Sequence, residues 1–461
     1  MRKIYKFFRF IVRGYIIPVH SSRRKIVVKL YQISLKKVIR WWKIKNSKRH
    51  QIRKILKKSR DKYFKNLPLR SVLNLRDDGR PKILVIPSAY PSRKSPLVGT
   101  FFQEQSNVML PDFDVKILYG HRKELNGEGF SYSINNRLEN PEGLYFYYDY
   151  CQLDPEIDNY QRMVWSYEVI LDEIIENGWS PDVIHAHSSI YGGIVAHYLG
   201  KKFKVPVVLS EHMMFLLHDF SKFLQDKVFE AFEGVNLVNS LSTDKMRAIL
   251  MHGIKCDPIV IGNMVDDELF NISDEKNSNE LFEILIVAGA SYIKDLQTFF
   301  KSIREIIDAG HEDIHATIIG NGVWGDENYS AHLKELKIEK YCSFVGTVAR
   351  TDMPRYYNKC DVFVSSSIAE GFQVSILEAM VSGKPVVTTR HGGAEDNMRS
   401  ENGILVGIRD FKAIADAIIK IKTHEVEFDP KTIRQTVVEK YGKVAFKKKI
   451  ADIYDDLIEG K

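Results

Sequence analysis

The sequence predicts an α/β protein made of two doubly wound domains, and three observations lead to this fold class. From Pro81 onward, short apolar runs alternate with segments of helical periodicity, which is typical of parallel sheets covered by helices on both faces. A polar stretch over residues 271–279 interrupts the alternation, which then restarts. The chain has 461 residues, more than one ordinary core accommodates.

The apolar runs are short enough to be strands. In a first domain over residues 79–270, with helices over 162–177 and 191–202, we expect strands over 82–87, 115–118, 182–185 and 205–209. In a second domain over residues 281–440, we expect strands over 284–287, 316–319, 343–345, 362–364 and 385–387. Residues 441–461 are expected to form a helix that packs back on the first domain. Ligands would bind in the cleft where the carboxyl ends of both sheets face each other.

Composition limits the class of protein. Apolar residues make up 44% of the chain and charged residues 27%, which is ordinary for a globular protein and excludes a largely disordered one. The four cysteines lie far apart and form no Cys-x-x-Cys pair, which argues against a structural zinc site and a disulfide framework. This cysteine usage suits a reducing cytoplasm, so we expect a cytoplasmic protein.

Charge is distributed unevenly along the chain. Residues 1–70 contain 24 Lys or Arg and one acidic residue, Asp61, for a net charge of +23, whereas the remainder carries −15. The apolar stretch before Pro18 is too short to span a bilayer and is interrupted by Arg9 and Arg13. We therefore expect a basic amphipathic extension over residues 1–78, without a cleaved signal peptide or a spanning helix.

The segment 26–43 suggests what the extension does. At helical periodicity its apolar and aromatic side chains, including Trp41 and Trp42, gather on one face, and most of its lysines and arginines gather on the other. Such a helix can lie in an anionic membrane surface, where each cation contributes about 1 kcal/mol. We expect residues 1–70 to hold the protein peripherally on the inner face of the plasma membrane. Packing of this face on the protein body or a partner is the alternative, and no nucleic-acid partner is expected.

A pair of glutamates, Glu370 and Glu378, is the sharpest signal for chemistry. They follow a predicted strand and a serine-rich loop. We expect Glu370 at the entrance of a helix and Glu378 about two turns along it, roughly 12 Å away along the axis. Two acceptors so placed would engage opposite ends of an extended ligand, and the free N–H groups of the helix start favour an anion between them. Downstream, backbone amides at Gly392 and Gly393 would approach phosphate oxygens, unless this is simply a tight turn.

These segments resemble the C-terminal signature of the family 4 retaining glycosyltransferases, which have the GT-B fold of two Rossmann-like domains. The similarity extends over residues 80–460. In the second domain it is carried by residues 319–322, 344–346, 365–387 and 392–393. In the first domain and just before the linker it is carried by residues 90–91, 99–102, 104–105, 185–187, 211–212 and 261–266.

The resemblance implies roles for individual residues. Glu370 would hydrogen-bond hydroxyl groups of the donor sugar, Glu378 the ribose of the nucleotide, and Lys294 would neutralise the departing diphosphate. His212 would lie across the cleft near the reacting centre of the sugar, and His187 is a weaker candidate on the acceptor side. The remaining donor-binding candidates are Gly99, Gly320, Gly371, Phe372, Gly392 and Gly393.

Simpler explanations exist for three of the polar candidates. Lys294 would be a solvated lysine at a helix start, and His212 a hydrogen-bonded histidine at a strand end. His185 is expected to point into the core.

One position departs from the family pattern. The family has an arginine a few residues before the phosphate lysine, and Ala290 stands at that position here. Loss of one of two phosphate cations would weaken leaving-group stabilisation by about a few kcal/mol unless another cation compensates. Arg350 and Arg390 are candidates for this compensation.

No metal and no cofactor beyond the nucleotide-sugar substrate are expected. Asp112 and Asp114 form an Asp-x-Asp sequence, but they precede a strand away from the expected cleft. The expected reaction is front-side transfer, with retention, from a UDP- or GDP-linked sugar to a lipid-linked or envelope-glycan acceptor. A nucleotide-sugar epimerase and a non-catalytic scaffold subunit of the same fold are the alternatives.

Overall fold

The computed structural model describes residues 48–65, 69, 73–75, 77–91, 98–133, 141–214, 217–273, 281–322 and 327–460. The apolar stretch before Pro18 and the amphipathic segment 26–43 lie outside these residues. The chain divides into two compact units. One contains the helix over residues 48–64, Gly120–Tyr132 and Phe146–Glu173; the other contains most of the N-terminal sheet and all of the C-terminal sheet. All contacts of the candidate functional site that the structure describes lie within the second unit.

The N-terminal sheet has eight strands in the order β3-β4-β2-β1-β5-β6-β7-β8. Its central strands pair in parallel, as the alternating pattern predicts, from β2 through β1 and β5 to β8. The strands are β1 (Lys82–Pro87), β2 (Asp114–Lys123), β3 (Phe130–Ser133), β4 (Gly143–Asp149), β5 (Val183–His187), β6 (Val207–Glu211), β7 (Leu237–Ser240) and β8 (Ile259–Val260).

Helices connect the strands of the N-terminal sheet. They are α4 (Thr100–Met109), α5 (Glu156–Glu176), the irregular turn η2 (Ser189–Gly193), α6 (Ile194–Phe203), η3 (Leu217–Asp219), α7 (Lys222–Gly234) and α8 (Thr243–Met251). Ile83 and Val85, two residues apart on β1, face one side of the sheet and pack with Phe102 and Met109 of α4. Leu84 and Ile86, which point to the other side, are buried as well, so β1 buries both of its faces.

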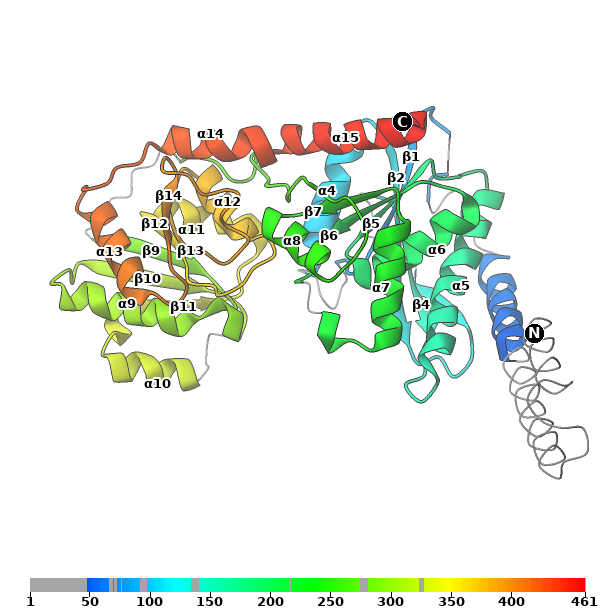
Figure 1. Cartoon of the computed structure of the whole chain (residues 1–461), viewed down its shortest axis with the longest axis horizontal. Coiled ribbons are helices and arrows are strands. Elements are labelled where there is room, and N and C mark those ends of the chain that lie inside the picture. Colours follow the sequence, from blue (N-terminus) through cyan, green and yellow to red (C-terminus); the bar gives the residue numbers. More distant parts are fainter. Residues whose placement is uncertain are drawn as a thin grey trace, which may run out of the picture. The chain divides into compact units, whose positions relative to one another are not determined.

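The C-terminal sheet has six strands in the order β11-β10-β9-β12-β13-β14, all parallel (Figure 1). Ile284 and Ile286 of β9 face a core shared with α9 and α13, whereas Leu285 between them faces the core shared with α11 and α12. The strands are β9 (Phe282–Val287), β10 (Ile314–Ile319), β11 (Cys342–Gly346), β12 (Val362–Ser365), β13 (Val386–Thr389) and β14 (Gly403–Val406). The helices are η4 (Tyr292–Lys294), α9 (Leu296–Asp308), α10 (Glu327–Leu336), η5 (Glu339–Tyr341), η6 (Arg350–Asp352), α11 (Met353–Lys359), α12 (Val374–Val381) and α13 (Phe411–Lys422).

Two consecutive helices end the chain (Figure 1). α14 (Pro430–Tyr441) packs on α12 of the C-terminal sheet, and α15 (Lys443–Glu459) packs on α4 and β5 of the N-terminal sheet. Tyr454 of α15 is buried there, and its hydroxyl lies 2.6 Å from Nδ1 of His185. The last helix therefore supplies part of the N-terminal core.

The helix over residues 48–64 belongs to the basic segment and packs on α5 within the first unit. Arg60 pairs with Glu173 at 2.6 Å, and Lys48 pairs with Asp158 at 2.8 Å. Leu56 on the inner face of this helix is buried. This portion of the basic segment therefore packs on the protein body. Along the residues that the structure describes, no helix has the length and apolar character needed to cross a membrane.

Candidate functional site

Of the two glutamates, Glu370 lies in a loop and Glu378 on a helix. The sequence predicts Glu370 at the entrance of the helix that carries Glu378, but α12 begins only at Val374, so that Glu370 lies in the loop after β12 and only Glu378 is helical. Backbone hydrogen bonds fix this loop: Glu370 N donates to His391 O (3.1 Å) and Ile368 N donates to Ile293 O (2.8 Å). Glu370 is thus placed between the ends of β9, β12 and β13, where a parallel sheet binds its ligands.

Lys294 and Glu370 form an ion pair. Lys294 is the last residue of η4, after β9, and its Nζ lies 2.5 Å from Glu370 Oε1. Ser367 Oγ donates to the same carboxylate oxygen (2.9 Å), and Ser366 Oγ donates to the backbone oxygen of Lys294 (2.9 Å). Lys294 is therefore engaged in the site, and the serine-rich loop positions both charged groups.

Glu378 is held at both carboxylate oxygens. Arg350 pairs with Oε1, and the Tyr357 hydroxyl donates to Oε2 (2.8 Å). Arg350 also pairs with Glu104 of α4. Burial alone would lower the pKa of Arg350, but Glu378 and Glu104 outweigh burial and raise it, so the guanidinium stays charged. A carboxylate has about four lone-pair positions, so two partners leave room for ribose hydroxyls.

The Gly392–Gly393 turn follows β13. Gly392 has φ of +90°, a conformation that favours glycine, and a side chain there would meet the carboxylate of Asp244 at 2.5 Å. Gly392 N donates to Glu395 Oε2 (2.9 Å) and Gly393 N to His391 Nδ1 (3.2 Å). Burial lowers the pKa of His391 to about 4, so its ring is neutral at physiological pH. A phosphate at these amides would replace contacts that the protein makes to itself.

Three histidines cluster at the ends of β5 and β6. His185 lies in the core, as expected, with Nε2 2.8 Å from Ser210 Oγ. His187 is buried as well, and its Nδ1 lies 3.0 Å from Nε2 of His212, while the Phe102 ring packs against both. Burial lowers the pKa of His187 and of His212 well below the ordinary value, so both rings are neutral. His187 therefore contacts His212 rather than an open surface.

The other donor-site candidates contribute backbone rather than side chains. Gly99 precedes α4. Gly320 follows β10, where a side chain would lie 1.9 Å from Ala288 O, so the close approach of two strands requires glycine. Phe372 is buried, with its ring 5.4 Å from that of Tyr441.

Neither of the two arginines proposed to compensate for Ala290 has a clear position as a phosphate-binding cation. Arg350 is committed to Glu104 and Glu378, and Arg390 is exposed after β13. Ala290 itself is fixed by a hydrogen bond from its N–H to Asn321 O (2.9 Å).

The N-terminus of α8 also reaches the site, which the sequence did not predict. Ser242 Oγ donates to Gly371 O (3.1 Å), and Thr243 N donates to Asp396 Oδ2 (2.6 Å). These contacts connect the N-terminal sheet to the loops that carry Glu370 and Gly392. They depend on tertiary structure, and no local sequence pattern marks them.

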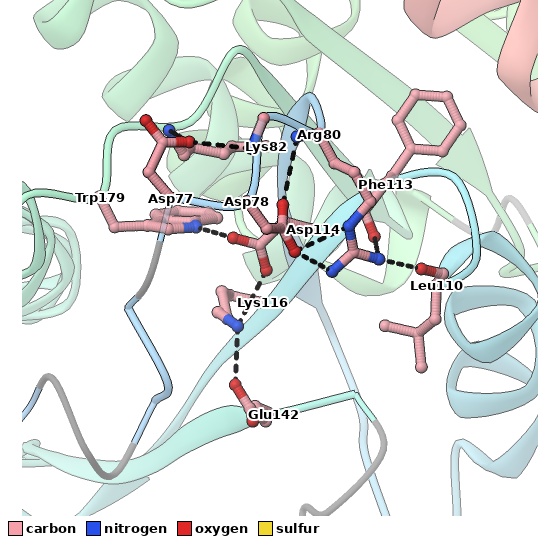
Figure 2. Close-up of polar contacts among 11 residues, drawn as sticks. Asp77, Asp78, Arg80, Lys82, Leu110, Phe113, Asp114, Lys116, Glu142 and Trp179 are labelled. Carbon is pink, nitrogen blue, oxygen red and sulfur yellow. Dashed lines mark hydrogen bonds and ion pairs between the residues drawn. The ribbon is translucent and has the colours of Figure 1, made fainter.

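Asp114, the second aspartate of the Asp-x-Asp sequence, has a structural role (Figure 2). Asp114 begins β2 and is buried; it accepts a hydrogen bond from Trp179 Nε1 (2.6 Å) and pairs with Lys116 (2.9 Å), which also pairs with Glu142 (2.7 Å). This network lies at the amino end of β2, whereas the site lies at carboxyl ends. In the part of the chain that the structure describes, no group of three or more His, Cys, Asp or Glu side chains could hold a metal ion.

Family models match both halves of the chain. The model for glycosyl transferases group 1 matches residues 282–424, and the model for glycosyltransferase family 4 matches residues 135–269. The chain belongs to the family 4 glycosyltransferases. It is therefore an enzyme that transfers a sugar from a nucleotide-sugar donor.

Curated relatives of this glycosyltransferase act on different acceptors. The UDP-Gal:alpha-D-GlcNAc-diphosphoundecaprenol alpha-1,3-galactosyltransferase of Escherichia coli is 26% identical over 307 residues, which cover 61% of this chain and 76% of the relative. The alpha-monoglucosyldiacylglycerol synthase of Streptococcus pneumoniae is 22% identical over 315 residues, which cover 60% and 67%.

Solved structures share the fold of this glycosyltransferase. HepE of Anabaena, in complex with UDP, matches with a TM-score of 0.65 at 18% identity, over 82% of this chain and all of that one. The lipopolysaccharide outer core galactosyltransferase WaaB matches with a TM-score of 0.61 at 16% identity, over 82% and 99%. The predicted fold class, two Rossmann-like domains of the GT-B kind, is confirmed.

Proposed function

We propose that this glycosyltransferase transfers its sugar with retention of configuration to a lipid-linked or envelope-glycan acceptor at the cytoplasmic face of the membrane. The Lys294–Glu370 ion pair carries the proposal for the reaction. It joins a cation suited to a departing diphosphate with a carboxylate suited to sugar hydroxyls, at the carboxyl end of the C-terminal sheet.

Each side chain has a proposed task in the reaction. The donor diphosphate draws the ammonium of Lys294 toward itself, and Glu370 accepts hydrogen bonds from hydroxyl groups of the sugar. Glu378, oriented by Tyr357 and Arg350, accepts from the ribose. The bond from the anomeric carbon to the diphosphate breaks through an oxocarbenium-like state, and the acceptor hydroxyl attacks from the same face. Its proton passes to the leaving phosphate oxygen.

The proposed acceptor class is supported by the relatives and by charge. One relative is named for a substrate linked to diphosphoundecaprenol, and another for a diacylglycerol product. Residues 1–47 add 14 Lys or Arg and no acidic residue. A basic segment next to a glycosyltransferase suits an enzyme whose acceptor lies in an anionic membrane.

Thermal unfolding of the full chain with UDP, GDP and ADP in turn tests the donor site. A nucleotide at 100 times its Kd stabilises the folded state by about 2.7 kcal/mol. We expect one base to stabilise the protein and the effect to be lost in Glu378→Gln. If none of the three nucleotides stabilises the full chain, the proposed donor site is wrong.

Turnover tests the reaction and the acceptor. With the matching nucleotide-sugar, we expect transfer to a polyprenyl-diphosphate sugar or a diacylglycerol lipid in vesicles, and an unchanged anomeric configuration in the product by NMR. Glu370→Gln should abolish transfer without changing the melting temperature. An inverted product, or transfer to soluble sugars alone, would contradict the proposal.

A further inference from the structure

Lys245 is a buried lysine near the site whose ammonium has no partner within the described chain. It lies in the first turn of α8 and is 4% exposed. Its backbone N–H donates to Ser242 Oγ (3.2 Å), but its Nζ makes no hydrogen bond or ion pair to any residue that the structure describes. Burying an unpaired charge is costly, so a protein that keeps one in a ligand site has a reason to do so.

The side chain of Lys245 points at the loop of Glu370. A methyl group added at Gly371 would lie 2.8 Å from Cε and 3.0 Å from Nζ of Lys245, and 3.6 Å from His212 O. Ser242, three residues earlier, donates to Gly371 O (3.1 Å). Lys245 therefore projects from α8 toward the loop where the donor is proposed to bind.

Two carboxylates lie near the ammonium, and neither pairs with it. Glu211 accepts from Ser189 N (2.9 Å) and Met213 N (2.7 Å), and Asp244 faces Gly392. Burial lowers the pKa of Lys245, although Glu211 and Asp244 act to raise it. An anion at the end of the side chain would supply the direct partner that neither carboxylate provides.

We propose that Lys245 provides the second positive charge for the donor diphosphate, from α8, in place of the arginine that Ala290 lacks. The inference rests on the proposed function. Lys294 approaches the Glu370 loop from the end of β9, and Lys245 approaches the same loop from the N-terminal sheet. Two cations on opposite sides would hold the leaving group as its negative charge develops.

Binding of UDP and of inorganic pyrophosphate to the full chain, measured by calorimetry, tests the proposal. Lys245→Met keeps the length of the side chain and removes the charge. We expect it to raise the Kd of both ligands about tenfold or more, since a hydrogen bond to a charged group is lost. Lys222→Met, which removes an exposed lysine paired with Asp226, is the matched control and should leave both constants unchanged.

Further binding measurements identify which anionic group of the ligand contacts Lys245. An equal loss of affinity for UDP and UDP-glucose supports the diphosphate, whereas a loss confined to UDP-glucuronate would assign Lys245 to a sugar carboxylate and overturn the proposal. Ala290→Arg in the Lys245→Met background should recover UDP affinity. If the wild type binds UDP and Lys245→Met binds it equally well, this inference fails alone; if the wild type binds no nucleotide, the proposed function fails with it.

Folding is checked separately. Because Lys245→Met replaces an ammonium that has no partner among the described residues by an apolar group, the ligand-free variant should melt at a temperature equal to or above that of the wild type. A higher melting temperature together with weaker UDP binding supports the proposal, because a merely structural lysine would not produce that combination.

Discussion

Glu378 shows how a single carboxylate is oriented for binding. Arg350 and Tyr357 hold its two oxygens, and Arg350 also reaches Glu104, so that one guanidinium joins α4 to α12. A carboxylate fixed in this way loses little conformational entropy when a ribose binds, because its side chain already adopts a single rotamer.

Tyr357→Phe tests this orientation. It leaves Oε2 of a buried carboxylate without its protein donor, so we expect a loss of about 1.5–3 kcal/mol in the free energy of unfolding. Nucleotide affinity should fall as well, because only Arg350 then fixes the orientation of Glu378. Chemical denaturation and calorimetry measure the two effects. Tyr356→Phe serves as the control, because among the described residues its hydroxyl contacts the exposed Arg355. Equal effects of the two variants would contradict the orientation.

The buried histidines predict a dependence of stability on pH. Burial lowers the pKa of His185 to about 3 and of His391 to about 4, and lowers those of His187 and His212. The unfolded chain binds protons below about pH 6.5, whereas the folded chain does not, so stability is complete above that pH and falls toward pH 4. Each histidine contributes about 1.4 kcal/mol per pH unit.

Urea unfolding between pH 7.5 and pH 4.5 measures this dependence. His185→Asn should reduce the slope of stability against pH, although it also lowers stability at pH 7.5 because the contact with Tyr454 is weakened. A stability that is constant from pH 7.5 to pH 5 would show that the histidines are not buried and neutral.

At the scale of elements, the helix over residues 48–64 contributes to the folded body. Leu56 is 1% exposed on its inner face, and its replacement by alanine should cost about 2–5 kcal/mol. The neighbouring Lys57 is exposed, so Lys57→Ala should change stability by less than about 0.5 kcal/mol. Limited proteolysis together with chemical denaturation tests the pair. If Leu56→Ala behaves like Lys57→Ala, the helix does not pack on α5.

Secondary-structure elements could be predicted from the sequence more completely than contacts between distant segments. All nine predicted strands coincide with observed ones, and all of these except β11 are buried along most of their length, so that they form apolar runs. β3, β4, β7, β8 and β14 were not predicted. β4 was missed because its tyrosines alternate with apolar residues, and β8 because it has only two residues. Glu370, Glu378 and Lys294 were found by a motif, whereas the contacts of Lys245, Tyr357 and Arg350 depend on how distant segments pack.

At the scale of the whole molecule, the basic segment separates into two parts. Residues 48–64 are ion-paired with α5, whereas residues 1–47 carry 14 positive charges and no acidic residue. Removal of residues 1–47 should abolish flotation with phosphatidylglycerol vesicles and leave UDP binding unchanged. For the full chain, flotation should weaken as salt rises, because the attraction is screened. Equal flotation of both proteins would contradict the membrane role of this segment.

The place of α15 has a consequence for synthesis on the ribosome. β9 through α13, with the C-terminal sheet, form one uninterrupted stretch of chain, so that sheet and these helices can form as soon as residue 422 has emerged. The N-terminal sheet is translated first, yet the face that carries Ile83 and Val85 awaits Tyr454 and its neighbours in the last helix. Roughly 200 residues lie between β8 and the end of α15. At a rate of synthesis of about 5–20 residues per second, their translation takes about 10–40 s. The N-terminal sheet is therefore translated first but completes its core last. During that interval its apolar face is a natural substrate for a chaperone.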